Sequence, residues 1–273
     1  MSPIPKITDR AVLLRNRARA QSAPADFLHE EAIAEIQDRL MLVNRSFTNV
    51  TIVTGHPAVW ARAFPDARII ADDETLELEP DTQDLVIHAM CLHWANDPIG
   101  QLIQCRRALR PDGLFMSVAF GGKTLFELRD SLTNAEIAAY GGLSPRIAPM
   151  TEIRDMGALL QRAGLALPVA DSVPVRVEYR DALHLMRDLR AMGEANALIE
   201  RHKTPVKPSL FAAAQEHYAR DFSTQSNRIL ATFEQVYLLG WAPAESQQKP
   251  LRPGSASHSL AAILGTSENP LKD

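Results

Sequence analysis

Hydrophobic residues in the first half of the chain form short apolar runs separated by segments with helical periodicity. Four runs are expected to be strands: Val50–Val53, Arg68–Ala71, Asp84–Met90 and Leu114–Phe120. Continuous apolar runs of this length are typical of strands that are buried on both faces of a parallel sheet. Because strands and helices alternate, the pattern predicts βαβ units and an α/β fold with a mostly parallel sheet.

The remaining segments predict helices and two later strands. Residues 8–43 are expected to be helical in two pieces that break near Pro24, with Asp26 as N-cap of the second piece. Further helices are expected over 57–64, 98–109, 124–140 and 151–163, and Gly164 ends the last of these. Strands are predicted over 167–179 and 231–241, and a turn over 110–113. The expected domains are an N-terminal helical segment (1–45), a Rossmann-like core (46–180), a helical cap insertion (181–228), a final strand completing the core (229–260) and a flexible tail (261–273).

Composition and charge narrow the class of protein. The formal net charge is −4, so no overall field favours nucleic acid. Cys91 and Cys105 are the only cysteines, and they offer neither a disulfide framework nor zinc spacing, which suggests a reducing compartment. No apolar run approaches the roughly 18 residues of a membrane span. We therefore expect a cytoplasmic protein, or a mitochondrial matrix protein if the source is eukaryotic, that binds no metal.

The N-terminal segment is basic. It carries four arginines against a single early acid, Asp9; these arginines are Arg10, Arg15, Arg17 and Arg19. Such a pattern occurs in transit peptides, but no apolar core or cleavage-like segment accompanies it here. An exposed basic helix face is the favoured interpretation.

The segment Asp84–Trp94, DLVIHAMCLHW, is the clearest candidate for a functional position. In open α/β sheets the ligand crevice lies beyond the carboxyl ends of the strands, which is where His93 and Trp94 fall. The His93 imidazole could act as a general base, and it is our catalytic candidate. The alternative is a structural histidine bonded to backbone. Trp94 is a substrate candidate, or a lid or core residue.

Several other residues are candidates for contacting a substrate. Gly121 and Gly122 allow close backbone approach at a strand end, and Thr124 could contact substrate or cap the next helix. Arginines at 129, 187 and 190 could hold an acidic group through forked hydrogen bonds, or form surface salt bridges. Tyr237 shares a strand face with Trp241; both are expected in the core, and Tyr237 is also a substrate candidate.

Taken together, several blocks resemble class I S-adenosylmethionine-dependent methyltransferases. More narrowly, they are similar to the branch that contains mitochondrial complex I assembly factor 5 and the malonyl-carrier-protein methyltransferase of biotin synthesis. The blocks are Asp9-Arg10, Ala71–Glu74, Asp84–Gly113 with Leu92-His93-Trp94, Phe120–Leu125, Glu127–Arg129, Asp188–Asn196, Gly240-Trp241, Gln248, Pro250 and Gly254–Ala256.

This resemblance implies a fold and a function. The fold would be a seven-stranded sheet with an antiparallel last strand at 231–241 and a helical cap at 181–228. The cofactor would be S-adenosylmethionine, and the acceptor a small or carrier-bound acid or a protein, including an arginine side chain of a respiratory complex I subunit. The cofactor positions carried over are Gly55, His56, Asp72, Asp73, Met90 and Leu92.

The turn after the first strand departs from the family pattern. Glycines normally let the cofactor approach the backbone there, but Gly55 is the only glycine of this turn, no carboxylate ends the strand, and Pro57 lacks an N–H. The interval to Asp72 is also short, so either 68–71 is the second strand and the third is missing, or the reverse. Asp72 would then face a ribose or an adenine; alternatively, residues 72–81 form a solvated acidic loop.

Three functions stay open on these grounds. The leading hypothesis is an S-adenosylmethionine-dependent methyltransferase of the assembly-factor type that acts on a protein or a small molecule. The second is a non-catalytic assembly or binding protein that kept the scaffold and lost the cofactor. The third is an enzyme that uses the same pocket for a different small ligand.

Overall fold

The computed structural model describes residues 6–248 and 265, and it divides the chain into two compact units. The first unit extends to Pro243 and the second begins at Ala244, of which 244–248 and 265 are described. In the second unit, Ala244 donates its N–H to the side chain of Gln247 at 3.2 Å. The predicted tail and the motif residues at 250 and 254–256 lie outside the described residues, apart from Gly265.

Two helices precede the sheet, as the break at Pro24 predicts: α1 (Arg10–Ala20) and α2 (Phe27–Leu42). Asp9 caps α1 by accepting the N–H of Val12 at 3.2 Å. Asp26 is the N-cap residue of α2, as predicted, and its carbonyl accepts the Glu30 N–H at 2.9 Å, but its side chain makes no cap bond with the described residues. Its carboxylate instead lies 3.5 Å from the Arg62 guanidinium.

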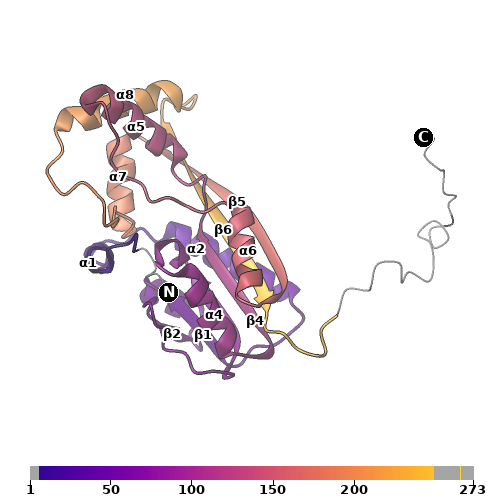
Figure 1. Cartoon of the computed structure of the whole chain (residues 1–273). Helices are drawn as coiled ribbons and strands as arrows, with labels where there is room; N and C mark the ends of the chain where they lie inside the picture. Colours follow the sequence, from indigo (N-terminus) through magenta and orange to yellow (C-terminus); the bar gives the residue numbers. More distant parts are fainter. Residues whose placement is uncertain (1–5, 249–264, 266–273) are drawn as a thin grey trace, which may run out of the picture. The chain divides into compact units, whose positions relative to one another are not determined.

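A six-stranded sheet forms the centre of the first unit (Figure 1). Its strands are β1 (Val50–Thr54), β2 (Arg68–Ile70), β3 (Gln83–Ala89), β4 (Leu109–Phe120), β5 (Ala166–Tyr179) and β6 (Ile229–Trp241). The strand order is β2-β1-β3-β4-β6-β5; the first four are parallel, and β6 is antiparallel to both neighbours. This confirms the predicted fold class and the antiparallel last strand.

The sheet has one strand fewer than the resemblance implies. Among the described residues β2 pairs with β1 alone and forms one edge of the sheet. Arg68–Ile70 is therefore the second strand, and the family's third strand has no counterpart here. Asp72 consequently follows the carboxyl end of a strand that neighbours β1.

One predicted turn is part of a strand. The segment Arg110–Gly113 carries strong turn signals, yet it lies inside β4. Asp112 has a φ of 65°, and the pairing jumps from Gln83–Leu109 to Leu85–Leu114. The Pro-Asp-Gly sequence thus forms a bulge, which lets the strand begin earlier than its apolar run suggests.

Helices cover the sheet, and three of them gather at one end of it. The remaining helices are α3 (Pro57–Ala63), the single 3₁₀ turn η1 (Leu92–Trp94), α4 (Pro98–Ala108), α5 (Phe126–Tyr140), α6 (Ile153–Arg162), α7 (Ala182–Ala191) and α8 (Pro208–Asp221). In Figure 1, α5, α7 and α8 lie together at the end toward which β5 and β6 extend. We call these three helices the cap from here on; α7 and α8 lie within the predicted insertion at 181–228, whereas α5 precedes it in the chain.

The central strands are buried on both faces. Leu85 and Ile87 of β3 belong to one hydrophobic cluster with α2 and the cap, while Val86 belongs to a second cluster with α4 and α6. This two-sided burial explains why the strands are apolar runs without alternation. Within the described part of the chain, no helix combines the length and hydrophobicity that crossing a bilayer requires.

Candidate functional site

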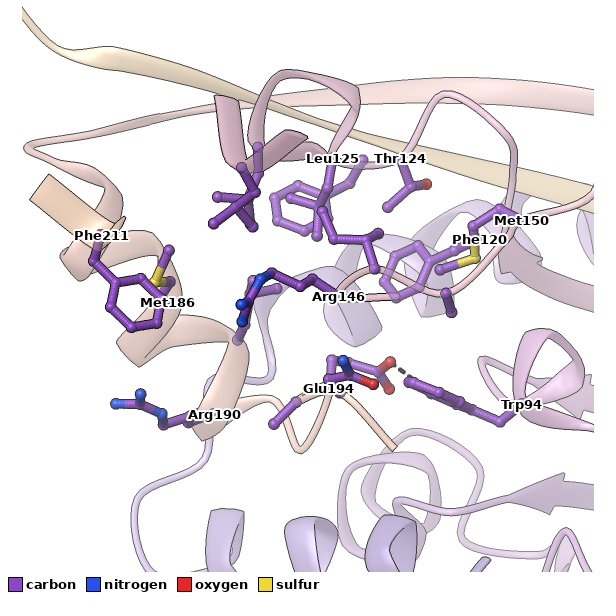
Figure 2. Close-up of a pocket in the computed structure, with 18 residues that line it drawn as sticks. Trp94, Phe120, Thr124, Leu125, Arg146, Met150, Met186, Arg190, Glu194 and Phe211 are labelled. Atoms are coloured by element: carbon purple, nitrogen blue, oxygen red, sulfur yellow. Dashed lines mark hydrogen bonds between the residues drawn. The ribbon is translucent and has the colours of Figure 1, made fainter. Parts of the chain in front are cut away.

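A pocket of about 220 Å³ lies between the cap and the carboxyl end of the sheet. Its walls come from Trp94 after β3, Phe120 at the end of β4, Leu128 of α5, Met186 of α7 and Phe211 of α8. Figure 2 shows the aromatic and methionine side chains on either side of a space that contains the carboxylate of Glu194. The pocket is therefore mostly apolar, and three charged residues also line it: Glu194, Arg146 and Arg190.

Glu194 is held by two neighbours at the strand end. Its Oε2 accepts hydrogen bonds from Trp94 Nε1 at 2.7 Å and from His93 Nε2 at 3.2 Å. Burial opposes ionisation, but the charge and hydrogen bond of His93 and the charge of Arg17 outweigh it and hold the Glu194 pKa at about 2. Glu194 is thus a carboxylate at neutral pH. Sequence reasoning missed it; the only signal was its place in the block Asp188–Asn196.

His93 lies beneath this carboxylate and its side chain is 2% exposed. Its Nδ1 is 3.5 Å from the backbone N–H of Phe120, which can only donate. If Nδ1 accepts that bond, the proton sits on Nε2 and points at Glu194. The geometry fits a histidine that orients a carboxylate, and the general-base role stays a prediction.

A second group of charged residues lies at the carboxyl ends of β1 and β2. Asp72 is 3% exposed and accepts from Arg17 Nη1 at 2.8 and 2.9 Å and from Arg10 at 3.1 and 3.2 Å. Burial raises the pKa of Asp72, but the two guanidinium groups lower it further, so the pKa lies below its ordinary value. The solvated-loop alternative is wrong for Asp72 and holds for Asp73, whose side chain is 65% exposed.

Arg17 was expected on an exposed basic helix face, and this is wrong. Its side chain is 4% exposed because α1 lies across the strand ends and directs the guanidinium onto Asp72. A Cβ added at Gly55 would lie 2.1 Å from Arg17 Nη1, so only glycine fits beneath that side chain. Arg17 Nε and Nη2 are buried without a hydrogen-bond partner among the described residues.

His56 lies next to this group, against His29. The two ring centroids are 4.4 Å apart, and Trp60 Nε1 donates to His29 Nδ1 at 3.1 Å. Burial lowers the pKa of His29 to about 3 and also lowers that of His56. A hollow of about 360 Å³ adjoins these residues, lined among others by Arg17, Gly55 and His56.

Most of the other predicted positions fall outside the cap pocket. Met90 and Leu92 are buried in the two hydrophobic clusters. Gly121 faces Val236 and Glu234, and Gly122 faces Glu152. Arg129 donates to the Thr124 carbonyl. The Tyr237 hydroxyl donates to Gln235, and the Tyr237 ring lies beneath the Arg39 guanidinium. Trp94, Thr124 and Arg190 do line the pocket, whereas Arg187 does not. Thr124 caps no helix: its hydroxyl bonds the backbone of Glu234 in β6.

Several known proteins are similar to this chain in sequence or in fold. Residues 33–117 match the methyltransferase domain family. The arginine-hydroxylase NDUFAF5, mitochondrial, of Danio rerio is 34% identical over 94% of this chain and 89% of its own length. The protein of that name from Dictyostelium discoideum is 41% identical over 72% of this chain, but the match spans only 45% of that protein.

Two further similarities agree with these matches. The malonyl-[acyl-carrier protein] O-methyltransferase of Laribacter hongkongensis is 33% identical over 72% of this chain and 63% of that protein. The crystal structure of the YcgJ protein from Bacillus subtilis superposes with a TM-score of 0.51 at 13% identity, over 79% of this chain and all of that one. The structural match bears on the fold alone.

The mostly parallel sheet with an antiparallel β6, the acid after β2 and the matching domain define a class I S-adenosylmethionine-dependent methyltransferase. Within that class, the chain belongs to the NDUFAF5 family. Membership favours the methyltransferase hypothesis over the non-catalytic alternative.

The strand ends fit the cofactor of this class. Asp72 places an acid after β2, where a ribose is commonly bound, and Gly55 leaves room above the backbone that the Arg17 guanidinium occupies. The unpartnered Nε and Nη2 of Arg17 are donors suited to a carboxylate such as that of the methionyl group. S-adenosylmethionine would thus be held by Arg17, Gly55 and Asp72.

Proposed function

We propose that this protein is an S-adenosylmethionine-dependent enzyme that receives an arginine-type side chain of a protein acceptor in the pocket beneath the cap. The acceptor would be a subunit of respiratory complex I, modified during assembly. The compartment would be the mitochondrial matrix in a eukaryote and the cytoplasm otherwise. The observation that carries the proposal is the ionised, fixed carboxylate of Glu194 in a mostly apolar pocket, which Arg146 and Arg190 also line.

Glu194 is suited to a cation. Both of its hydrogen bonds use Oε2, and Oε1 has no partner among the described residues. A guanidinium pairs with a carboxylate through directed N–H bonds, and the apolar walls exclude the water that would weaken the pair. Glu194 would repel the carboxylate of a malonyl group, whereas Arg146, which is paired with Glu136, and Arg190 line the same pocket and would attract one. The fixed carboxylate therefore supports a basic acceptor group at Glu194 itself, unlike the acidic acceptor named in the Laribacter protein.

The role of Glu194 in this reaction would be positioning. When bound, S-adenosylmethionine supplies an electrophilic methyl group on a sulfonium. A carboxylate with a pKa of about 2 is a poor base, so Glu194 would orient the acceptor nitrogen rather than take its proton. Correct orientation of reacting groups lowers the barrier by removing the entropy cost of bringing them together.

The experiment uses an arginine-containing peptide and a matched peptide with citrulline, which has the same shape without the charge. Binding of both peptides is measured with the wild type, Glu194→Gln and the exposed control Glu200→Gln. Losing a hydrogen bond between charged groups, worth about 1.5–3 kcal/mol, should weaken binding of the arginine peptide by Glu194→Gln roughly ten- to hundredfold. Citrulline binding and the control should be unchanged. Equal binding of both peptides by all three proteins would contradict the proposal.

The product identifies the reaction. Relatives carry the names arginine-hydroxylase and methyltransferase, which predict different additions to the acceptor. Mass spectrometry of the peptide after incubation with S-adenosylmethionine, in air and with an added electron donor, distinguishes a gained methylene from a gained oxygen. Either addition at the arginine supports the proposal, and an unmodified peptide that also fails to bind overturns it.

A further inference from the structure

The Asp72 carboxylate has no acceptor capacity left for a ligand. Arg17 Nη1 bonds both oxygens, at 2.8 and 2.9 Å, and Arg10 bonds one oxygen through Nη1 at 3.1 Å and the other through Nη2 at 3.2 Å. A carboxylate offers about four lone-pair positions, and four hydrogen bonds use them. A ribose diol that approaches Asp72 therefore needs at least one guanidinium to leave.

Arg17 is incompletely bonded where it lies. Its side chain is 4% exposed, yet Nε and Nη2 make no hydrogen bond to any part of the chain that the structure describes, which is costly for buried charged donors. The adjoining hollow of about 360 Å³ is lined by Arg17 and Gly55. A carboxylate entering that hollow would satisfy the free donors. Arg10 differs, since it does not line the hollow and 19% of its side chain is exposed.

We propose that cofactor entry is an exchange of partners. Arg10 and Arg17 are both bonded to Asp72 in the structure; when the cofactor binds, Arg17 transfers from Asp72 to the carboxylate of the methionyl group and the ribose hydroxyls take its place. Arg17 thus competes with the ribose and attracts the carboxylate, whereas Arg10 only competes. This inference rests on the proposed function, because it assumes that S-adenosylmethionine binds at these strand ends.

Two ligands separate the two actions of Arg17. S-adenosylhomocysteine carries both the ribose and the amino-acid carboxylate, and 5′-methylthioadenosine carries the ribose alone. Calorimetry should show that Arg17→Met binds methylthioadenosine about three- to tenfold more tightly than the wild type, because a competing ion pair is gone. The same variant should bind S-adenosylhomocysteine about tenfold or more weakly. Arg10→Met should bind both more tightly, and the exposed control Arg15→Met should match the wild type.

The outcomes distinguish this inference from the function on which it rests. If Arg17→Met loses affinity for both ligands in parallel, and Arg10→Met does not gain affinity for either, the exchange is overturned while the cofactor assignment stands. If no protein in the series binds either ligand, the cofactor assignment itself fails. Thermal unfolding of each variant shows whether it folds; should Arg17→Met not fold, Arg10→Met decides by gaining affinity or not.

Discussion

Two buried ionisable side chains near the site, His29 and Glu194, have strongly shifted pKa values. His29 is neutral at physiological pH because burial is the largest influence on its pKa, with the charge of His56 acting in the same direction. Its Nδ1 already accepts the indole N–H of Trp60. Glu194, equally buried, is ionised because His93 and Arg17 lie close to it. Burial thus keeps His29 neutral, whereas at Glu194 the neighbouring groups outweigh burial and keep the carboxylate charged.

The pKa of His29 predicts an acid-sensitive fold. Its folded pKa of about 3 lies below the ordinary value of 6.5, so the unfolded chain takes up a proton first as the pH falls. The contribution of neutral His29 to the free energy of unfolding is fully present above pH 6.5. It declines by about 1.4 kcal/mol per pH unit as the pH falls toward 3. When the pH is lowered from about 7.5 to about 5, the free energy of unfolding of His29→Gln, measured with urea, should fall by about 2 kcal/mol less than that of the wild type.

The control for this prediction is His202→Gln, since His202 is exposed and bonds only to Thr204. It should lose as much stability on acidification as the wild type does. An identical acid response of His29→Gln and the wild type would show that His29 does not carry the effect.

At the same scale, the sequence indicated only part of the site. Gly55, Asp72 and Trp94 could be placed because each follows an apolar strand, and parallel strands end at one edge. Arg17 and Glu194 could not be placed. Each reaches the site from outside the sheet, one from α1 and the other from the segment after α7, and only tertiary packing brings them to the strand ends. Spacing in the sequence carries no signal of that packing.

Among the secondary-structure elements, the sequence predicted the bounds that depend on local residue types. It predicted less well the bounds that depend on pairing between strands. The apolar runs located β1, β2 and β3, and Pro98 located the start of α4. The start of β4 was not predictable, because pairing with β3 continues across a bulge that reads as a turn. Asp26 holds the predicted N-cap position, but its carboxylate makes no cap bond because it faces Arg62 of the neighbouring helix α3.

Two aspartates that precede helices should therefore differ in their contribution to stability. The side chain of Asp97 caps α4 by accepting the Gly100 N–H at 2.8 Å, whereas the side chain of Asp26 accepts no N–H of α2. Replacing a capping aspartate by alanine costs about 1 kcal/mol, so Asp97→Ala should lower the free energy of unfolding by about that amount. Asp26→Ala should cost less, because its ion pair involves an exposed Arg62. Urea unfolding of both variants at neutral pH provides the measurement, and equal losses would contradict the assignment of the caps.

At the scale of the whole first unit, α1 connects the two parts of the site. Its arginines reach Asp72 at the strand ends, while the Asn16 side chain donates to the Ala195 carbonyl at 3.0 Å. The backbone N–H of Asp9, the N-cap residue of α1, donates to the Ala197 carbonyl at 2.8 Å. The segment that receives these bonds begins at Gly193, which packs against Arg17, and it carries Glu194 into the cap pocket. A shift of α1 on cofactor binding would therefore be transmitted to the acceptor carboxylate.

This connection predicts that cofactor and acceptor bind with positive coupling. The dissociation constant of the arginine peptide should fall several-fold when S-adenosylhomocysteine is present, and that of S-adenosylhomocysteine should fall by the same factor when the peptide is present, because coupling is reciprocal. Asn16→Ala, which removes the bond to Ala195, should reduce the factor toward one without abolishing either binding. Asn134→Ala removes a comparable side-chain-to-backbone bond within α5 and should leave the factor unchanged. Calorimetric titrations with each ligand alone and together provide the four constants. A factor that is the same in Asn16→Ala and the wild type would mean that the two parts of the site communicate by another route, or that α1 does not move when the cofactor enters.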